Sequence, residues 1–79
     1  MKPLLVPSVT MSDDYGVITV QLTAKTGQNQ KAYSANRVVA NGTSSENKQY
    51  ATDNPIQVKE LIINALYDVA EQYAVDLIQ

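Results

Sequence analysis

Polar and apolar residues alternate along the first part of the chain, and this pattern predicts β-strands. The clearest example is Val17–Thr23, where Ile18, Val20 and Leu22 fall on one face and the residues between them are Thr or Gln. A period of two is typical of an antiparallel strand with one buried face. Pro7 cannot donate a ladder hydrogen bond, so the strand that contains it is expected at a sheet edge or a bend. We predict strands over about residues 4–11, 17–24 and 30–40.

Turn-forming residues separate these strands. Ser12–Gly16 and Lys25–Asn29 are rich in Ser, Asp, Asn and Gly, which favour tight turns. The Asn41-Gly42 dipeptide is favoured in type I′ hairpins, so we expect a tight reversal there. The polar residues that follow either return as a short fourth strand over 47–52 or form an exposed loop.

A long helix is predicted at the C-terminus. Asn54-Pro55-Ile56-Gln57 supplies an N-cap, a Pro at the first helical position and a Gln three residues after the cap. Because no Gly or Pro follows, the helix is predicted over 55–78, a length of about 36 Å. The expected fold is an α+β single domain over 1–79: an antiparallel meander of three strands, with a fourth left open, and this helix on one face (β-β-β-α).

The apolar surface of this helix is wider than one small sheet requires. At 100° per residue seven polar side chains fall within an arc of about 120°, and the rest of the helix is nearly all apolar over about 200°, roughly twice what packing on one sheet needs. The polar arc holds Gln57, Glu60, Asn64, Asp68, Glu71, Gln72 and Gln79. A first apolar stripe holds Val58, Ile62, Leu66, Val69, Tyr73 and Leu77, and a second holds Ile56, Ile63, Tyr67, Ala70, Ala74 and Ile78.

The sequence leaves two alternatives for what packs on the second stripe. Either the N-terminal strand or the polar loop wraps over it, or it meets another chain, most simply the same stripe of a second copy. We expect the second, because a chain of 79 residues without disulfides has a thin core, which oligomerisation stabilises. The predicted self-association residues are Ile63, Tyr67, Ala70, Ala74 and Ile78.

The five tyrosines divide by spacing. Tyr67 and Tyr73 lie at helical core spacing and are predicted to pack, whereas Tyr15, Tyr33 and Tyr50 are predicted to be exposed.

The composition excludes most of the catalytic and metal-binding chemistry that small domains use. The chain has no Cys and no His, which excludes disulfides, zinc sites with those ligands, Cys or Ser–His nucleophiles and imidazole acid–base catalysis. Asp13 and Asp14 are adjacent acids in a turn-forming segment, and we expect them to cap the turn rather than to catalyse or bind metal. The three glycines are isolated, so no phosphate-binding loop is present. We therefore expect no enzyme activity, no metal and no cofactor.

Charge is distributed unevenly and suggests two surfaces. Residues 1–52 carry five basic and three acidic side chains, while residues 53–79 carry one basic and five acidic. One candidate is an acidic helix face that would meet a basic partner, formed by Glu60, Asn64, Asp68 and Glu71. The other is a basic sheet surface with tyrosines that could stack on bases, formed by Lys25, Lys31, Tyr33, Arg37, Lys48 and Tyr50. A net charge of −2 disfavours nucleic acid as the partner.

No targeting or membrane segment is expected. The apolar run Leu4–Val6 ends at Pro7, well short of a signal-peptide core, and no segment reaches the ~20 apolar residues of a membrane span. We expect the chain to begin at its own initiator Met and to be cytoplasmic, since secreted proteins this small usually need disulfides.

The leading functional hypothesis is a non-catalytic protein-binding module, homodimeric, that docks on a partner protein of unknown identity. In size and composition it is similar to the compact inhibitors that phages encode, which act by docking. The strand–strand–strand–helix order also resembles the second half of a double-stranded-RNA-binding domain, but that family's helix begins with basic residues and Asn54-Pro55-Ile56-Gln57 has none. The alternatives are a nucleic-acid-binding module that uses the basic sheet surface, and a structural subunit of a larger assembly.

Overall fold

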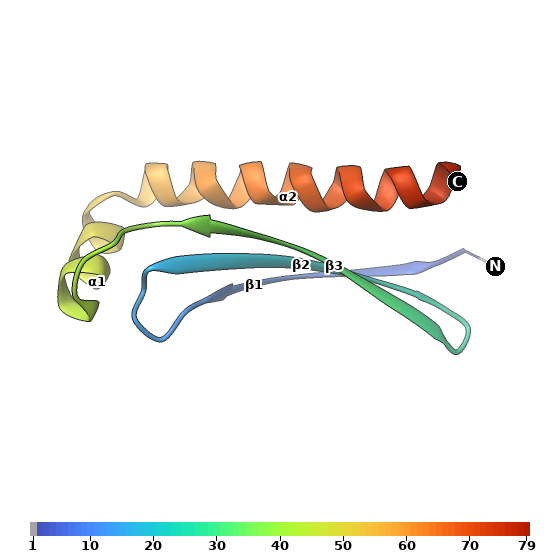
Figure 1. Ribbon diagram of the computed structural model, residues 1–79, viewed down its shortest axis with the longest axis horizontal. Coiled ribbons are helices and arrows are strands. Elements are labelled where there is room, and N and C mark those ends of the chain that lie inside the picture. The colour runs from blue at the N-terminus through green and yellow to red at the C-terminus, as the bar shows by residue number, and fades with distance from the viewer. Residues whose placement is uncertain (1) are drawn as a thin grey trace.

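A three-stranded antiparallel sheet and a long helix form two layers in the computed structural model, which describes residues 2–79. The sheet order is β1-β2-β3, and α2 runs along one face of the sheet while α1 sits at one end (Figure 1). The predicted α+β class, with a three-stranded antiparallel sheet followed by one long helix, is confirmed. The elements are β1 (Leu4–Met11), β2 (Val17–Thr26), β3 (Asn29–Val38), α1 (Ser44–Asp53) and α2 (Pro55–Ile78).

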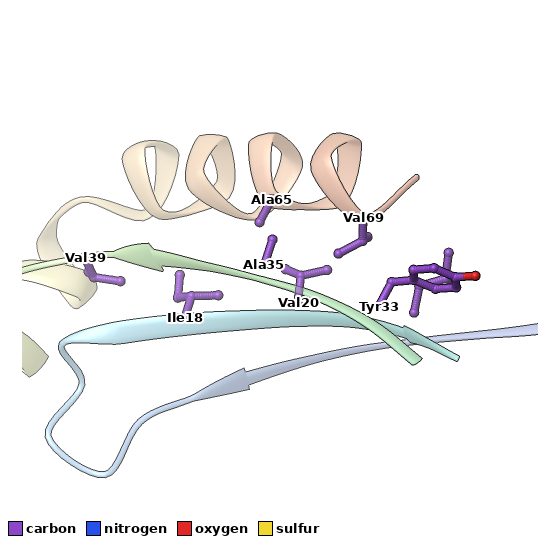
Figure 2. Close-up of a cluster of buried hydrophobic side chains, with 8 residues drawn as sticks. Ile18, Val20, Tyr33, Ala35, Val39, Ala65 and Val69 are labelled. Atoms are coloured by element: carbon purple, nitrogen blue, oxygen red, sulfur yellow. The ribbon is translucent and has the colours of Figure 1, made fainter. Parts of the chain in front are cut away.

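The register of the strands decides which side chains meet the helix. Val20 of β2 lies opposite Val9 of β1 and Ala35 of β3, and residues that are directly paired share a face of the sheet. The helix-facing side of β2 therefore carries the alternating apolar residues that the sequence pattern predicts, and that of β3 carries Tyr33 and Ala35 between Lys31 and Arg37. Figure 2 shows them between the sheet and α2. The buried core consists of Ile18, Val20, Leu22, Tyr33, Ala35, Val39, Ala65 and Val69.

The inner face of α2 uses most of the predicted first stripe but is rotated from its centre. Val58, Ile62, Val69 and Tyr73 of that stripe lie in the core or pack against it. Ala65 and Val69 are fully buried, whereas Leu66 and Leu77 of that stripe are 40% and 64% exposed. At 100° per residue, the buried direction differs from the centre of the predicted stripe by about 50°. The cause is the set of polar contacts that one flank of α2 makes with β3, described below.

Two of the tyrosine predictions are wrong. Tyr67 is 71% exposed, and Tyr33 is only 9% exposed. Tyr33 lies opposite Leu22 in the register, and Leu22 points toward the helix, so Tyr33 enters the core as well. There its ring meets Tyr73 of α2 edge to face, with centroids 5.8 Å apart.

Residues 44–53 form helix α1. The prediction of a possible strand at 47–52 and the prediction of a hairpin at Asn41-Gly42 are therefore both wrong. A capping box starts this helix: Thr43 Oγ1 accepts from the Glu46 N–H at 3.2 Å, and Glu46 Oε1 accepts from the Thr43 N–H at 2.9 Å. The two bonds satisfy N–H groups that a helix start leaves unpaired. This signal follows immediately after the Asn-Gly pair and outweighs the turn preference of that pair.

The start of α2 is placed correctly, although its predicted cap is not. Pro55 occupies the first turn as expected, but the Asn54 side chain makes no N-cap hydrogen bond. Its amide instead donates to the Tyr50 carbonyl at 2.9 Å, which closes the end of α1.

Asn47 joins α1 to the β1–β2 turn from a buried position. Its side chain is 1% exposed; Nδ2 donates to the Asp14 carbonyl at 2.9 Å, and Oδ1 accepts from the Gly42 N–H at 2.9 Å. Gly16 lies against it, because a Cβ at position 16 would come within 3.2 Å of Asn47 Nδ2. One side chain therefore links two loops that are far apart in the sequence.

We predict that Asn47→Ala lowers the free energy of unfolding by about 2–3 kcal/mol, because it removes a buried side chain and the partly buried hydrogen bonds that it makes with the backbone of Asp14 and Gly42. Gln49→Ala, at an exposed position on the same helix, serves as the control and should change it by less than about 0.5 kcal/mol. Denaturant unfolding followed by circular dichroism measures both. Equal stability of Asn47→Ala and the unmodified chain would contradict this role.

Candidate protein-interaction surface

One flank of α2 is tied to β3 by polar side chains. Arg37 donates from Nε and Nη2 to Asn64 Oδ1, at 2.9 and 2.8 Å, and from Nη2 to Asp68 Oδ2 at 3.2 Å. Gln72 donates to the Ser34 carbonyl at 3.0 Å. We call this row of contacts the α2–β3 seam. It holds the helix in its observed rotation over the sheet.

The seam ends in a cluster around Asp76. Asp76 Oδ2 accepts from Lys31 Nζ at 2.5 Å and from the Tyr33 hydroxyl at 2.6 Å. The Lys31 ammonium also lies 5.4 Å from the centre of the Tyr33 ring, within reach of a cation–π contact. Lys31 and Tyr33 are both on the helix-facing side of β3, so the strand presents its charge and its aromatic ring to the same carboxylate.

These contacts shift the pKa values of the groups involved. The hydrogen bond from Lys31, with that from Tyr33, lowers the pKa of Asp76 below its usual value. Hydrogen bonds from Gln72 and then Arg37 lower the pKa of Asp68. The carboxylate of Asp76 in turn raises the pKa values of Lys31 and Tyr33, mainly through its hydrogen bonds to them. All four shifts favour the protonation states present near neutral pH.

Two of the four residues of the predicted acidic helix face form hydrogen bonds within the chain. Asn64 and Asp68 are the residues that bond to Arg37. Glu60 and Glu71 are exposed and form no ion pair among residues 2–79. Two carboxylates of the predicted set thus remain available to a partner.

The structure does not bring the predicted basic surface together. Lys31, Tyr33 and Arg37 lie on the helix-facing side of β3, where α2 bonds to them. Lys25 alternates onto the opposite face of the sheet, since its neighbour Ala24 is the one that faces the helix. Lys48 and Tyr50 lie on α1, at the far end of the sheet from the β2–β3 hairpin (Figure 1).

The second apolar stripe of α2 points away from the sheet and is uncovered. No described segment packs over it, and its exposed fractions include 40% for Ile63, 71% for Tyr67 and 84% for Ile78. Figure 1 shows open space beyond this side of the helix, opposite the sheet. We call this set the outer stripe: Ile56, Ile63, Tyr67, Ala70, Ala74 and Ile78.

A second uncovered apolar surface lies on β1. All eight residues of β1 are exposed. Alternate ones share the helix-facing side of the sheet, because they are paired with the core residues of β2. The helix packs on β2 and β3 and leaves them bare. We call this set the β1 face: Leu5, Pro7, Val9 and Met11.

Sequence reasoning missed the β1 face as a surface, because alternation alone predicts a buried side for each strand. The predicted sheet nevertheless has more strands than one helix can cover. One helix about 10 Å across covers two strands spaced about 4.8 Å apart, and three strands were predicted.

The molecule is extended and exposes a large area for its mass. Its accessible surface is 5623 Å², whereas a compact monomer of 8.6 kDa exposes about 4,700 Å². Its radius of gyration is 14.7 Å, against about 11.6 Å for a compact domain of this length. The excess surface of about 900 Å² is close to the ~800 Å² that each partner buries in a stable protein interface.

The remaining polar features are the turn that contains Asp14 and two shallow hollows. Asp14 is occupied in its own turn: hydrogen bonds from the Ser12 hydroxyl and then the Gly16 N–H lower its pKa. Two shallow hollows of about 380 and 490 Å³ flank the Lys31–Asp76 contact near the C-terminal end of α2. Residues 2–79 contain no group of three or more acidic side chains placed to hold a metal ion. No helix within that range is long and apolar enough to cross a membrane.

Comparison of the chain with protein-family models, with curated proteins and with solved structures finds no match. A functional proposal must therefore be built from the surfaces described above.

We predict that the free energy of unfolding falls as the pH is lowered below about 4.5. The folded pKa values of four carboxyls, those of Asp14, Glu46, Asp68 and Asp76, lie below the usual range. Their stabilisation is therefore present above that range and is lost as the pH falls through the folded values.

The variant Asp76→Asn tests the contribution of one of these groups. It should lose less stability than the unmodified chain between about pH 6 and about pH 3, because one of the four linked protonations is absent. Glu71→Gln, on the same helix, is the control and should follow the unmodified chain. Urea unfolding at each pH gives the comparison, and identical pH profiles for all three proteins would contradict the assignment.

Proposed function

We propose that this chain is a non-catalytic protein-binding module that forms a homodimer and acts by docking on a partner protein. The observation that carries the proposal is the uncovered apolar surface, chiefly the outer stripe of α2. A monomer rarely leaves a contiguous apolar strip of this kind in water, and such strips mark protein contacts.

The exposed area supports association with another protein. The excess of about 900 Å² over a compact monomer equals one side of a standard interface. Its central segment is apolar, since the outer stripe contains no charged or amide side chain between Ile63 and Ala74. Tyr67 at its centre is the residue type most often found to dominate binding energy.

A second copy is the partner that fits the outer stripe itself. Like charges do not oppose the contact, because the charged residues of α2 lie on its flanks. The small residues Ala70 and Ala74 allow another element to approach closely, and Ile63 and Tyr67 supply large groups beside them. Self-association also adds to a core that has eight buried apolar residues in the part of the chain that the structure describes.

Docking on a different protein is assigned to the polar flank of α2. Glu60 and Glu71 remain exposed there, beside the α2–β3 seam, and their charge favours a basic partner surface. Compact inhibitors work by occupying a surface of their partner, and this mode of action needs no catalytic group.

The dimer is tested by the mass in solution. Between about 1 and 100 μM we expect a mass approaching twice 8.6 kDa by analytical ultracentrifugation. Tyr67→Lys should raise the dissociation constant at least about 30-fold, because it places a charge at the centre of an apolar contact.

The matched control is Gln57→Lys, which makes the same change of charge on the polar flank of α2. It should dimerise like the unmodified chain, and circular dichroism should show all three proteins folded. A strict monomer at the highest concentration would refute the homodimer.

Docking is tested by affinity capture of the tagged protein from its native lysate at low salt, with and without nuclease. We expect a discrete protein in both samples, and less of it with the double variant Glu60→Lys, Glu71→Lys. The control Gln49→Lys, on α1, should recover the normal amount. Bound material that disappears after nuclease treatment would instead point to nucleic acid.

A further inference from the structure

We infer that the outer stripe of α2 in one copy packs on the β1 face of the other, so that the two sheets enclose both helices. This inference rests on the proposed homodimer and specifies its interface. The β1 face and the outer stripe are the two large apolar surfaces that the fold leaves bare, and a reciprocal contact covers both at once.

The space above β1 has the width of a helix. The helix α2 packs on both β2 and β3, and strands are spaced about 4.8 Å apart, so β1 lies about 7 Å to one side of the helix axis. Helices packed side by side have axes about 8–10 Å apart. A second helix laid against the flank of α2 would therefore lie above β1.

The flank of α2 that borders this space is apolar beyond Lys59, which lies near the start of the helix. The opposite flank carries the α2–β3 seam, so the side toward β1 presents Leu66 and Leu77, which are 40% and 64% exposed. In a symmetric pair these flanks meet each other while each outer stripe meets the partner's β1 face. The contact is isologous and closes at two copies, because the outer stripe of each copy meets the β1 face of the other.

Length and charge also match. The apolar positions Leu5 to Met11 span about 20 Å at 3.4 Å per residue, and the outer-stripe segment Ile63 to Ala74 spans about 17 Å at 1.5 Å per residue. No charged residue lies in β1 or on the outer stripe, so neither surface has to be desolvated at the cost of an unpaired charge.

Two other dimers leave more apolar surface bare. Packing the outer stripes back to back would leave the β1 face of both copies exposed. Pairing β1 with β1 edge to edge would leave the outer stripes exposed, and Pro7 in the middle of the strand cannot donate to such a ladder. The reciprocal contact is the one that covers both surfaces.

Cysteine cross-linking tests the contact directly, because the chain has no native Cys. One copy carries Val9→Cys on the β1 face, and a second, of different length because of a tag, carries Ala70→Cys on the outer stripe. After mixing, a short bis-maleimide should give a cross-linked heterodimer on a denaturing gel. Ser8→Cys, on the same strand but on the opposite face, replaces Val9→Cys in the control and should give at least about tenfold less product.

A second measurement does not depend on cross-linking. Val9→Lys should raise the dimer dissociation constant at least about tenfold, whereas Ser8→Lys should leave it within about twofold. Circular dichroism checks that both variants are folded.

The outcomes separate this inference from the proposal on which it rests. A monomeric unmodified chain would overturn both. A dimer that persists in Val9→Lys, with Val9→Cys cross-linking no better than Ser8→Cys, would overturn the reciprocal contact and leave the homodimer standing. Selective cross-linking of Val9→Cys to Ala70→Cys, with weakened association of Val9→Lys, would support it.

Discussion

A single α-helix is about 10 Å wide, and a sheet of three strands needs more than that to be covered on one face. In this chain α2 lies over β2 and β3, and the eight residues of β1 are all left exposed. The bare β1 face follows from this difference in width. The outer stripe is bare for a second reason, because it lies on the side of α2 that points away from the sheet.

The polar contacts of α2 decide which two strands it covers. Arg37, Ser34 and Lys31 of β3 each bond to a side chain on α2, and together they draw the helix toward the outer edge of that strand. These contacts pair two of the five basic residues of 1–52, Lys31 and Arg37, with two of the five acidic residues of 53–79, Asp76 and Asp68. Part of the uneven charge along the chain therefore attaches the helix to the sheet, and exposed carboxylates such as Glu60 and Glu71 are available to a partner.

The sequence predicted β1 and α2 over their observed ranges and β2 and β3 to within two residues, because each has a strong period and clear end signals. It failed for α1, where an Asn-Gly turn preference and a capping box lie in adjacent residues and favour different structures. Single-residue propensities do not rank such neighbouring signals. The tertiary bonds of Asn47 add stability to the helix, and they are not readable from local sequence.

For the candidate surfaces, periodicity located the outer stripe but gave the wrong rotation of the helix. The apolar pattern alone centred the buried side near Ile62 and Tyr73, whereas in the structure it is centred on Ala65 and Val69, toward the hydrogen bonds to β3. Polar contacts between elements distant in the sequence determined this rotation. The periodicity of apolar residues along the helix does not reveal such contacts. The β1 face was missed for a related reason, since it depends on how many strands one helix reaches.

The buried side chain of Asn47 also has a consequence for the order in which the fold assembles. Both hairpins are made from neighbouring segments and close over short loops, whereas the bond from Asn47 to Asp14 spans 33 residues. We expect α1 to consolidate only after the β1–β2 turn exists, and to open before the sheet does. In native-state hydrogen exchange, residues 44–53 would then lose protection at lower denaturant concentrations than β2. Equal protection of the two segments would show that the molecule opens as a single unit.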